Sequence, residues 1–102
     1  MGRTAGYARV LESRIVNAII QKIRTFDQVV VRKRHGTAFG VSGDPDLFGA
    51  IGGRHFEIEV KRPGEVPTVL QQARMAEWRA CGAIVGCATS VEQALAILGL
   101  VR

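Results

Sequence analysis

The sequence predicts an α/β fold with the element order helix, three strands, helix, strand, helix. Two apolar-alternating runs within residues 43–61 are separated by Gly52-Gly53, which indicates a β-hairpin. A predicted helix at 68–81 leads to a short apolar run at 83–88, which predicts a buried strand, and such a strand–helix–strand step usually joins parallel strands. We therefore expect an αβββαβ core in which a mixed four-stranded sheet carries helices on both faces.

Length and composition indicate one domain over residues 1–102, with a modest core from 47% hydrophobic residues. The absence of an 18-residue apolar run and of an apolar signal segment leads us to expect a cytoplasmic protein without a membrane span. Cys81 and Cys87 are too few for a disulfide framework, so we expect both to be reduced core residues. The net charge of +5 favours a polyanionic partner such as nucleic acid over a merely basic surface.

The first predicted helix covers residues 7–25, after a loose segment at 1–6. Its apolar stripe comprises Ala8, Ile15, Val16, Ile19 and Ile23. Glu12 falls in the middle of this stripe, where a lone carboxylate would be costly. Glu12 is therefore paired with a buried arginine, or close enough to the helix end to reach water, or a third acid of a metal site.

A strand is predicted over residues 28–34, and its run of three valines suggests that both faces are covered. The basic residues that end this strand form either a solvated cluster or a phosphate contact, and His35 after them is more consistent with a loop or DNA-facing residue than with a metal ligand. The loop at 36–45 is rich in glycine and could approach a ligand closely. Pro45 restricts the backbone at the entry to the next strand.

The hairpin places two acids opposite each other. Counting outward from the glycine pair aligns Phe48 with Glu57 and Asp46 with Glu59, so the Asp46 and Glu59 Cβ atoms should lie about 5 Å apart. Lys61 lies two residues further along the same face. Hard divalent cations prefer carboxylate oxygens and would relieve the repulsion between the two acids. The hairpin therefore predicts a metal site beside a lysine, with Glu57 peripheral to it.

Two helices complete the chain. The helix at 68–81 begins at Pro67 or Thr68, and Gly82 ends it. Gln71 in its first turn is either an ordinary surface glutamine or a residue that bonds a water or phosphate. Ser90 is a predicted N-cap of the last helix, which ends at Gly99.

This arrangement resembles the PD-(D/E)xK nuclease superfamily and, more narrowly, the VRR-NUC family. The motif residues are Pro45-Asp46 and Glu59-Val60-Lys61. The narrower resemblance also uses Gly43, Leu47, Arg62-Pro63-Gly64, Gln71, Arg79-Ala80-Cys81-Gly82 and Ser90-Val91-Glu92-Gln93-Ala94-Leu95. Two departures are the segment at 65–69, where the family often has a Leu-Ser-Pro turn, and Asp44, where a small or apolar residue is common.

The resemblance implies Mg²⁺- or Mn²⁺-dependent hydrolysis of a DNA phosphodiester. Asp46 and Glu59 would bind the ion together with the Val60 main-chain carbonyl. Lys61 would orient the attacking water and stabilise charge on phosphorus.

The other site residues have supporting roles in this interpretation. Glu12 would hold a more distant water or a second ion, and Gln71 would position Lys61 or the phosphate. Candidate DNA contacts are Arg32, Lys33, Arg34, Arg62 and Arg74. No segment resembles a base-reading helix, so we expect recognition of DNA shape.

The substrate and assembly also follow from the resemblance. Small standalone members are similar to homodimeric enzymes that cut branched DNA, including four-way junctions, and a twofold dimer would supply two active sites. Three alternatives remain open: a non-catalytic DNA-binding module, a structural protein whose charges pair across the sheet, and a nuclease of the same fold that acts in restriction or DNA-end processing.

Overall fold

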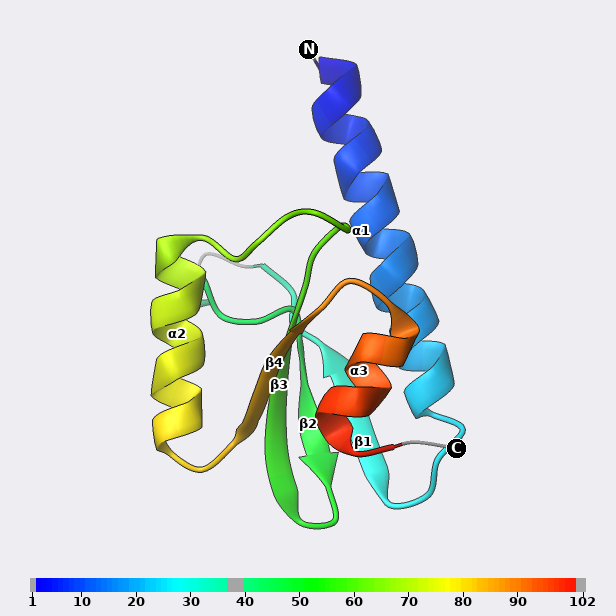
Figure 1. Ribbon diagram of the computed structural model, residues 1–102, viewed down its shortest axis with the longest axis vertical. Helices are drawn as coiled ribbons and strands as arrows, with labels where there is room; N and C mark the ends of the chain where they lie inside the picture. The colour runs from blue at the N-terminus through cyan, green and yellow to red at the C-terminus, as the bar shows by residue number, and fades with distance from the viewer. Residues whose placement is uncertain (1, 37–39, 101–102) are drawn as a thin grey trace.

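The computed structural model describes residues 2–36 and 40–100, with the side chains from residue 6 onward. Its elements are α1 (Gly2–Ile23), β1 (Val29–Lys33), β2 (Leu47–Ile51), β3 (Arg54–Val60), α2 (Val69–Ala80), β4 (Ile84–Ala88) and α3 (Val91–Leu98). This order confirms the predicted α/β class (Figure 1).

The four strands form one mixed sheet in the order β1-β2-β3-β4. The first three are antiparallel, and β4 pairs with β3 in parallel. The predicted hairpin register is confirmed, because Phe48 lies opposite Glu57 and Ile51 opposite Arg54. Gly52 and Gly53 both have positive φ angles, as the tight turn between β2 and β3 requires.

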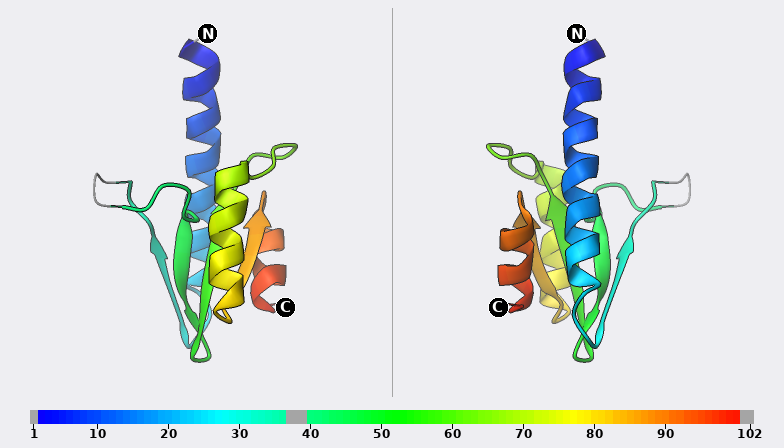
Figure 2. Two further views of the ribbon diagram at one scale, coloured as in Figure 1. Left: turned by 90° about the vertical axis from the view of Figure 1, so that its left-hand side faces the viewer. Right: turned by 90° about the vertical axis from the view of Figure 1, so that its right-hand side faces the viewer.

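Helices cover both faces of the sheet, as predicted. In Figures 1 and 2, α2 lies on one side, and α1 and α3 lie on the other. The side of α1 and α3 holds the main core, to which alternate β3 residues Phe56, Ile58 and Val60 contribute. The intervening residues Glu57 and Glu59 are also buried, so two carboxylates lie inside a small protein, on the opposite face of β3.

The first helix is longer than predicted and extends beyond the sheet (Figure 1). The expectation of a loose segment at 1–6 is wrong for the described residues, because α1 begins at Gly2. Tyr7 and Val10 in the projecting part are 65% and 48% exposed, whereas Ile19 and Ile23 are fully buried. Only the C-terminal half of α1 is therefore packed into the core.

Both outer strands are less buried than predicted. Val30 in β1 is half exposed, so the strand is covered on one face only. Strand β4 is the other edge of the sheet and is mostly half-buried rather than buried. Cys81 is exposed, so the expectation that it lies in the core is wrong, while Cys87 is half-buried. None of the described helices is long and apolar enough to cross a membrane.

Candidate active site

Asp46 lies immediately before β2, at the point where three contacts fix the chain. The Arg34 backbone N–H donates to the Asp46 carbonyl oxygen at 2.7 Å. The Val60 N–H donates to Asp46 Oδ2 at 2.9 Å. Upstream, Gly43 has a φ of +85° and packs so closely on Leu70 that an added Cβ would lie 2.8 Å from its Cγ. The Asp46 carboxylate is therefore directed across the hairpin toward the end of β3.

Glu59 occupies the facing position on β3 and is only 2% exposed. Its Oε2 atom is buried and has no hydrogen-bond partner among the described residues. Burial raises the pKa of Glu59 to about 9, and hydrogen bonding to Asp46 and the charge of Asp46 act in the same direction. Lys61 opposes this shift. At neutral pH the metal-free acid pair therefore holds a proton.

The five predicted catalytic residues all line one cavity of about 310 Å³. It lies between α1, the end of β1, the β2–β3 pair and the start of α2. Its lining residues are Arg9, Glu12, Ser13, Val16, Lys33, Asp46, Glu59, Val60, Lys61 and Gln71. Segments far apart in the sequence thus converge on the acid pair, as the sequence predicted for α1 and α2.

Glu12 is half-exposed, because α1 carries it past the edge of the packed core. It makes no ion pair within the described part of the chain, so a buried arginine partner is not present. No cluster of three or more His, Cys, Asp or Glu side chains forms a metal site in residues 2–36 and 40–100. Glu12 therefore faces the cavity without completing a three-acid set with Asp46 and Glu59.

Gln71 has a structural role as well as a place in the cavity. Its backbone N–H donates to the Thr68 hydroxyl, and its Oε1 accepts from the Thr68 N–H, which forms a capping box at the start of α2. This pairing holds the side chain in one orientation beside Lys61. The sequence predicted the position of Gln71 but not its hydrogen bonds with Thr68.

The donor set fits a divalent cation. Asp46 and Glu59 offer carboxylate oxygens from adjacent strands, and one Glu59 oxygen is buried without a partner. Such an oxygen is costly in a protein interior unless it binds a proton or a cation. Hard ions such as Mg²⁺ and Mn²⁺ accept carboxylate, carbonyl and water oxygens. Asp46, Glu59 and the Val60 carbonyl would hold such an ion.

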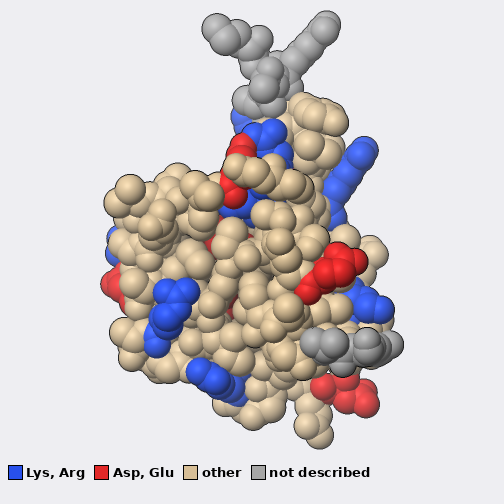
Figure 3. Space-filling model, viewed as in Figure 1, with Lys and Arg blue, Asp and Glu red and all other residues tan. Residues whose placement is uncertain are grey.

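The predicted basic residues differ in how accessible they are. Arg32 and Lys33 are exposed, and Lys33 reaches the cavity. Arg62 forms an ion pair with Glu65, and Arg74 bonds Glu77 and the Ser42 carbonyl oxygen. Figure 3 shows Lys and Arg atoms beside Asp and Glu atoms where the projecting part of α1 meets the remaining surface.

Arg34, a candidate DNA contact, is paired with Glu57. The Arg34 side chain is only 24% exposed and is not a free DNA contact, because its guanidinium is engaged by the Glu57 carboxylate and the Pro45 carbonyl oxygen. Glu57 does not line the cavity, and its side chain is 0% exposed. The alternating pattern of β3 correctly predicts which face of the sheet carries Glu57. It does not predict that Glu57 pairs with Arg34, which lies 23 residues away in the sequence.

Two cavity residues were missed at the sequence level. Arg9 and Ser13 both lie on α1 beside Glu12. Arg9 is three residues before Glu12 and therefore shares its helix face. Helical spacing from Glu12 was the signal that could have identified Arg9.

Together, fold and site define an α/β domain in which a half-buried Asp46, where β2 begins, lies beside a buried Glu59, where β3 ends. No protein-family model matches the sequence, and no curated protein does either. A solved structure titled "VRR_NUC domain" matches with a TM-score of 0.72 and 24% identity, over 90% of this chain and 98% of that chain. A second, titled "VRR_NUC domain protein", matches with a TM-score of 0.68 and 20% identity, over 86% and 84%. The chain therefore has the VRR-NUC fold, as the sequence resemblance predicted.

Proposed function

We propose that this protein is a nuclease that hydrolyses DNA phosphodiester bonds with Mg²⁺ or Mn²⁺. The observation that carries the proposal is that Asp46, whose carboxylate accepts from the Val60 N–H, shares one cavity with the buried Glu59 and with Lys61. The likeness to VRR_NUC domain structures supports the proposal. A structural protein would gain nothing from an acid pair that has to retain a proton at neutral pH and leaves a buried oxygen unpaired.

The metal would be held by Asp46, Glu59 and the Val60 carbonyl. When bound, a divalent ion supplies positive charge to the scissile phosphate and lowers the pKa of a bound water. The Val60 N–H keeps the Asp46 carboxylate at a fixed angle, so this ligand is in place before the ion binds. A preorganised ligand avoids part of the entropic cost of assembling the site.

Other chain residues would position the substrate and stabilise charge. Lys61 adds a fixed positive charge where negative charge develops on phosphorus, which is a major source of catalytic stabilisation. Gln71, held by Thr68, would hydrogen-bond the phosphate or Lys61. Glu12 is half-exposed and would act through a water at the cavity edge or hold a second ion.

Phosphates that flank the cut would contact basic residues around the cavity. Lys33 lines it, Arg9 reaches it from α1, and Arg32 is exposed on the same strand end. Arg62 and Arg74 are already paired with acids and would have to exchange partners to bind DNA. Arg34 is left out of this set. The overall charge of +5 supports attraction to a polyanion.

The finer proposal is that the substrate is branched DNA, such as a four-way junction, and that the enzyme acts as a homodimer. Residues 2–36 and 40–100 of one chain carry one cavity with paired acids, and two symmetric cuts need two such sites in a fixed relation. Nuclease action in restriction or at DNA ends is the alternative that keeps the same chemistry with another substrate shape.

A cleavage panel tests the proposal. Wild-type protein with Mn²⁺ should cut at least one of duplex, nicked, flap, single-stranded and four-way-junction DNA, with faster cutting of the junction. Asp46→Asn should lose cleavage while it binds the same DNA. Glu92→Gln, an exposed acid in α3, is the matched control and should cut at the wild-type rate. No cleavage of any substrate with either ion would contradict the proposal, and sedimentation of the same sample as a monomer would contradict the dimer.

A further inference from the structure

A second buried acid lies outside the cavity. Glu57 has a fully buried side chain, and both of its oxygens are engaged. Oε1 accepts from Arg34 Nη1 at 2.6 Å, and Oε2 accepts from Arg34 Nη2 at 3.1 Å. His55 Nε2 is 2.6 Å from Oε2. A two-point pair with arginine is the geometry that offsets the cost of burying a carboxylate, so the position of Arg34 is tightly defined.

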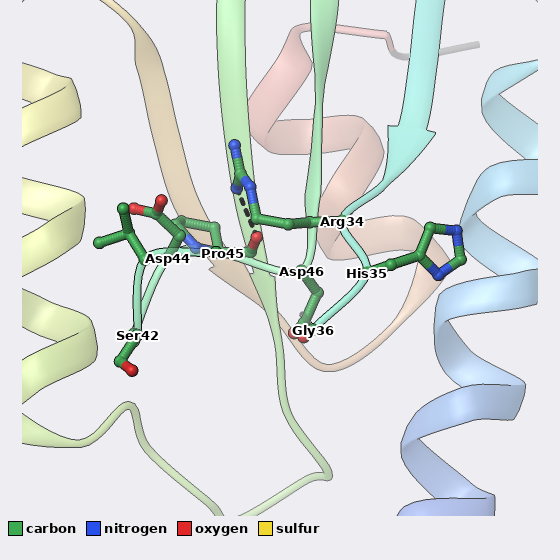
Figure 4. A pocket seen from close by; sticks show the side chains of 10 residues that line it. Arg34, His35, Gly36, Ser42, Asp44, Pro45 and Asp46 are labelled. Carbon is green, nitrogen blue, oxygen red and sulfur yellow. Dashed lines mark hydrogen bonds between the residues drawn. The ribbon is translucent and has the colours of Figure 1, made fainter. Parts of the chain in front are cut away.

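The same guanidinium fixes the chain that carries Asp46. Arg34 Nη1 also donates to the Pro45 carbonyl oxygen at 2.6 Å, while the Arg34 backbone N–H bonds the Asp46 carbonyl. Figure 4 shows Arg34 with its hydrogen bond to Pro45 and the Asp46 side chain pointing away from it. Arg34 thus bonds the carbonyl oxygens of both Pro45 and Asp46, while the Asp46 carboxylate, which accepts from the Val60 N–H, lines the cavity.

Aromatic contacts enclose the guanidinium. The Arg34 Cζ atom lies 4.7 Å from the Phe48 ring centroid and 5.8 Å from that of Trp78. Trp78 Nε1 donates to Asp44 Oδ1 at 3.1 Å, and its ring lies 4.9 Å from that of His55. Hydrogen bonding to Glu57 raises the pKa of Arg34 above its ordinary value, and burial opposes this shift.

The segment before Asp46 needs such an anchor. Gly36, Gly40 and Gly43 precede it, and glycine gives a chain the largest freedom to move. Asp46 is also repelled by Glu59 when both are ionised. Without an anchor on the segment before it, Asp46 could move away from Glu59, and the distance that a cation must bridge between the two carboxylates would increase.

We propose that Arg34, held in place by Glu57, is a positioning residue that fixes Asp46 opposite Glu59 for divalent-cation binding. The inference rests on the proposed nuclease function. Arg34 touches neither the ion nor the DNA in this account, so its loss should weaken metal binding rather than remove the chemistry. Groups that orient metal ligands typically contribute 10–100-fold to metal affinity.

The test removes both members of the pair. Arg34→Met alone would remove the two-point pair from the buried Glu57 and leave it only the His55 contact, which is destabilising, whereas replacing both charges with apolar residues is often neutral. The variant is therefore Arg34→Met combined with Glu57→Leu. Arg34→Lys is the second variant, since a single ammonium can pair with Glu57 but cannot also reproduce the two-point contact and the Pro45 bond. Arg54→Met is the control, because Arg54 is exposed and bonds Gly82 at the far end of the hairpin.

Mn²⁺ affinity is measured by calorimetry without DNA, on samples shown to be folded by circular dichroism. Both Arg34 variants should bind Mn²⁺ about tenfold more weakly than wild type and the control, and the Mn²⁺ concentration for half-maximal cleavage should rise by a similar factor. Excess Mn²⁺ should restore their cleavage but not that of Asp46→Asn.

The outcomes separate two failures. Absence of Mn²⁺ binding in the wild type overturns the proposed function and, with it, this inference. If the wild type binds Mn²⁺ and a folded Arg34 variant binds it with the same affinity, the positioning role is overturned. The nuclease proposal is then left intact. Should the double variant not fold, Arg34→Lys alone decides between these results.

Discussion

Metal binding should displace a proton from Glu59. In the metal-free protein, burial raises the pKa of Glu59 to about 9, with added effects of hydrogen bonding to Asp46 and of its charge. A cation held by Asp46 and Glu59 needs both carboxylates ionised. We therefore predict that Mn²⁺ binding at pH 7 releases about one proton from the wild-type protein.

The size of this effect follows from the pKa. A group with a pKa of about 9 is about 1% ionised at pH 7, and each pKa unit corresponds to about 1.4 kcal/mol. Removing the proton therefore costs about 3 kcal/mol at pH 7. The apparent Mn²⁺ affinity should rise roughly tenfold per pH unit between pH 6 and pH 8 and level off above the pKa.

Calorimetry in two buffers of different ionisation enthalpy measures the released proton directly. Glu59→Gln should bind Mn²⁺ weakly and release no proton, since it has no titrating carboxyl. Glu92→Gln should behave as the wild type, because its exposed carboxyl lies in the first turn of α3. Wild-type binding with no proton release and equal affinity at pH 6 and pH 8 would refute the reasoning.

Three further predictions concern stability in urea denaturation. Because the pKa of Glu59 is raised on folding, the metal-free wild type should lose stability as pH rises from about 4.5 to about 9. Glu59→Gln should flatten this trend, and an equal loss of stability in the variant would contradict the raised pKa of Glu59. Gly49→Ala should cost at least about 2 kcal/mol, since its Cβ would lie 1.8 Å from the Val30 carbonyl oxygen, and unchanged stability would be inconsistent with that approach. Thr68→Ala should cost about 1 kcal/mol by removing the capping box, whereas Thr68→Ser should be near neutral.

Local patterns were enough to predict much of the fold. The Gly52-Gly53 turn fixes the hairpin register, because the side-chain period of a strand leaves one alignment once the turn is placed. Ser90 and Gly99 bound α3 as predicted, through a side-chain N-cap and a left-handed C-cap. Both signals depend on neighbouring residues only.

Features that depend on distant contacts could not be predicted. The run Val29–Val31 has the composition of a covered strand, but the sheet order makes β1 an edge, and only the paired side and the α1 face are protected. Arg34 belongs to a basic run that looks like a DNA contact, yet its partner Glu57 lies on another strand. Burial of an ion pair is decided by which strands become neighbours, and this information is not local.

The candidate site was predictable for a different reason. Asp46, Glu59 and Lys61 lie on one hairpin, so two-residue periodicity alone places them together. The positions of Glu12 and Gln71 near the site were predicted from the helix faces on which they lie and from the resemblance to the VRR-NUC family. The hold of Arg34 on Pro45 did not, because it combines a side chain and a backbone carbonyl 11 residues apart in a loop without periodicity.

We expect DNA to be cut at this cavity and Lys61 to act in the cleavage step rather than in DNA binding. The most direct measurement is the single-turnover rate of Mn²⁺-dependent cleavage by Lys61→Ala, on the DNA that the wild type cuts fastest. We expect the cleavage rate to fall by about a hundredfold or more, with DNA affinity largely retained. Cleavage by folded Lys61→Ala at the wild-type rate would contradict it.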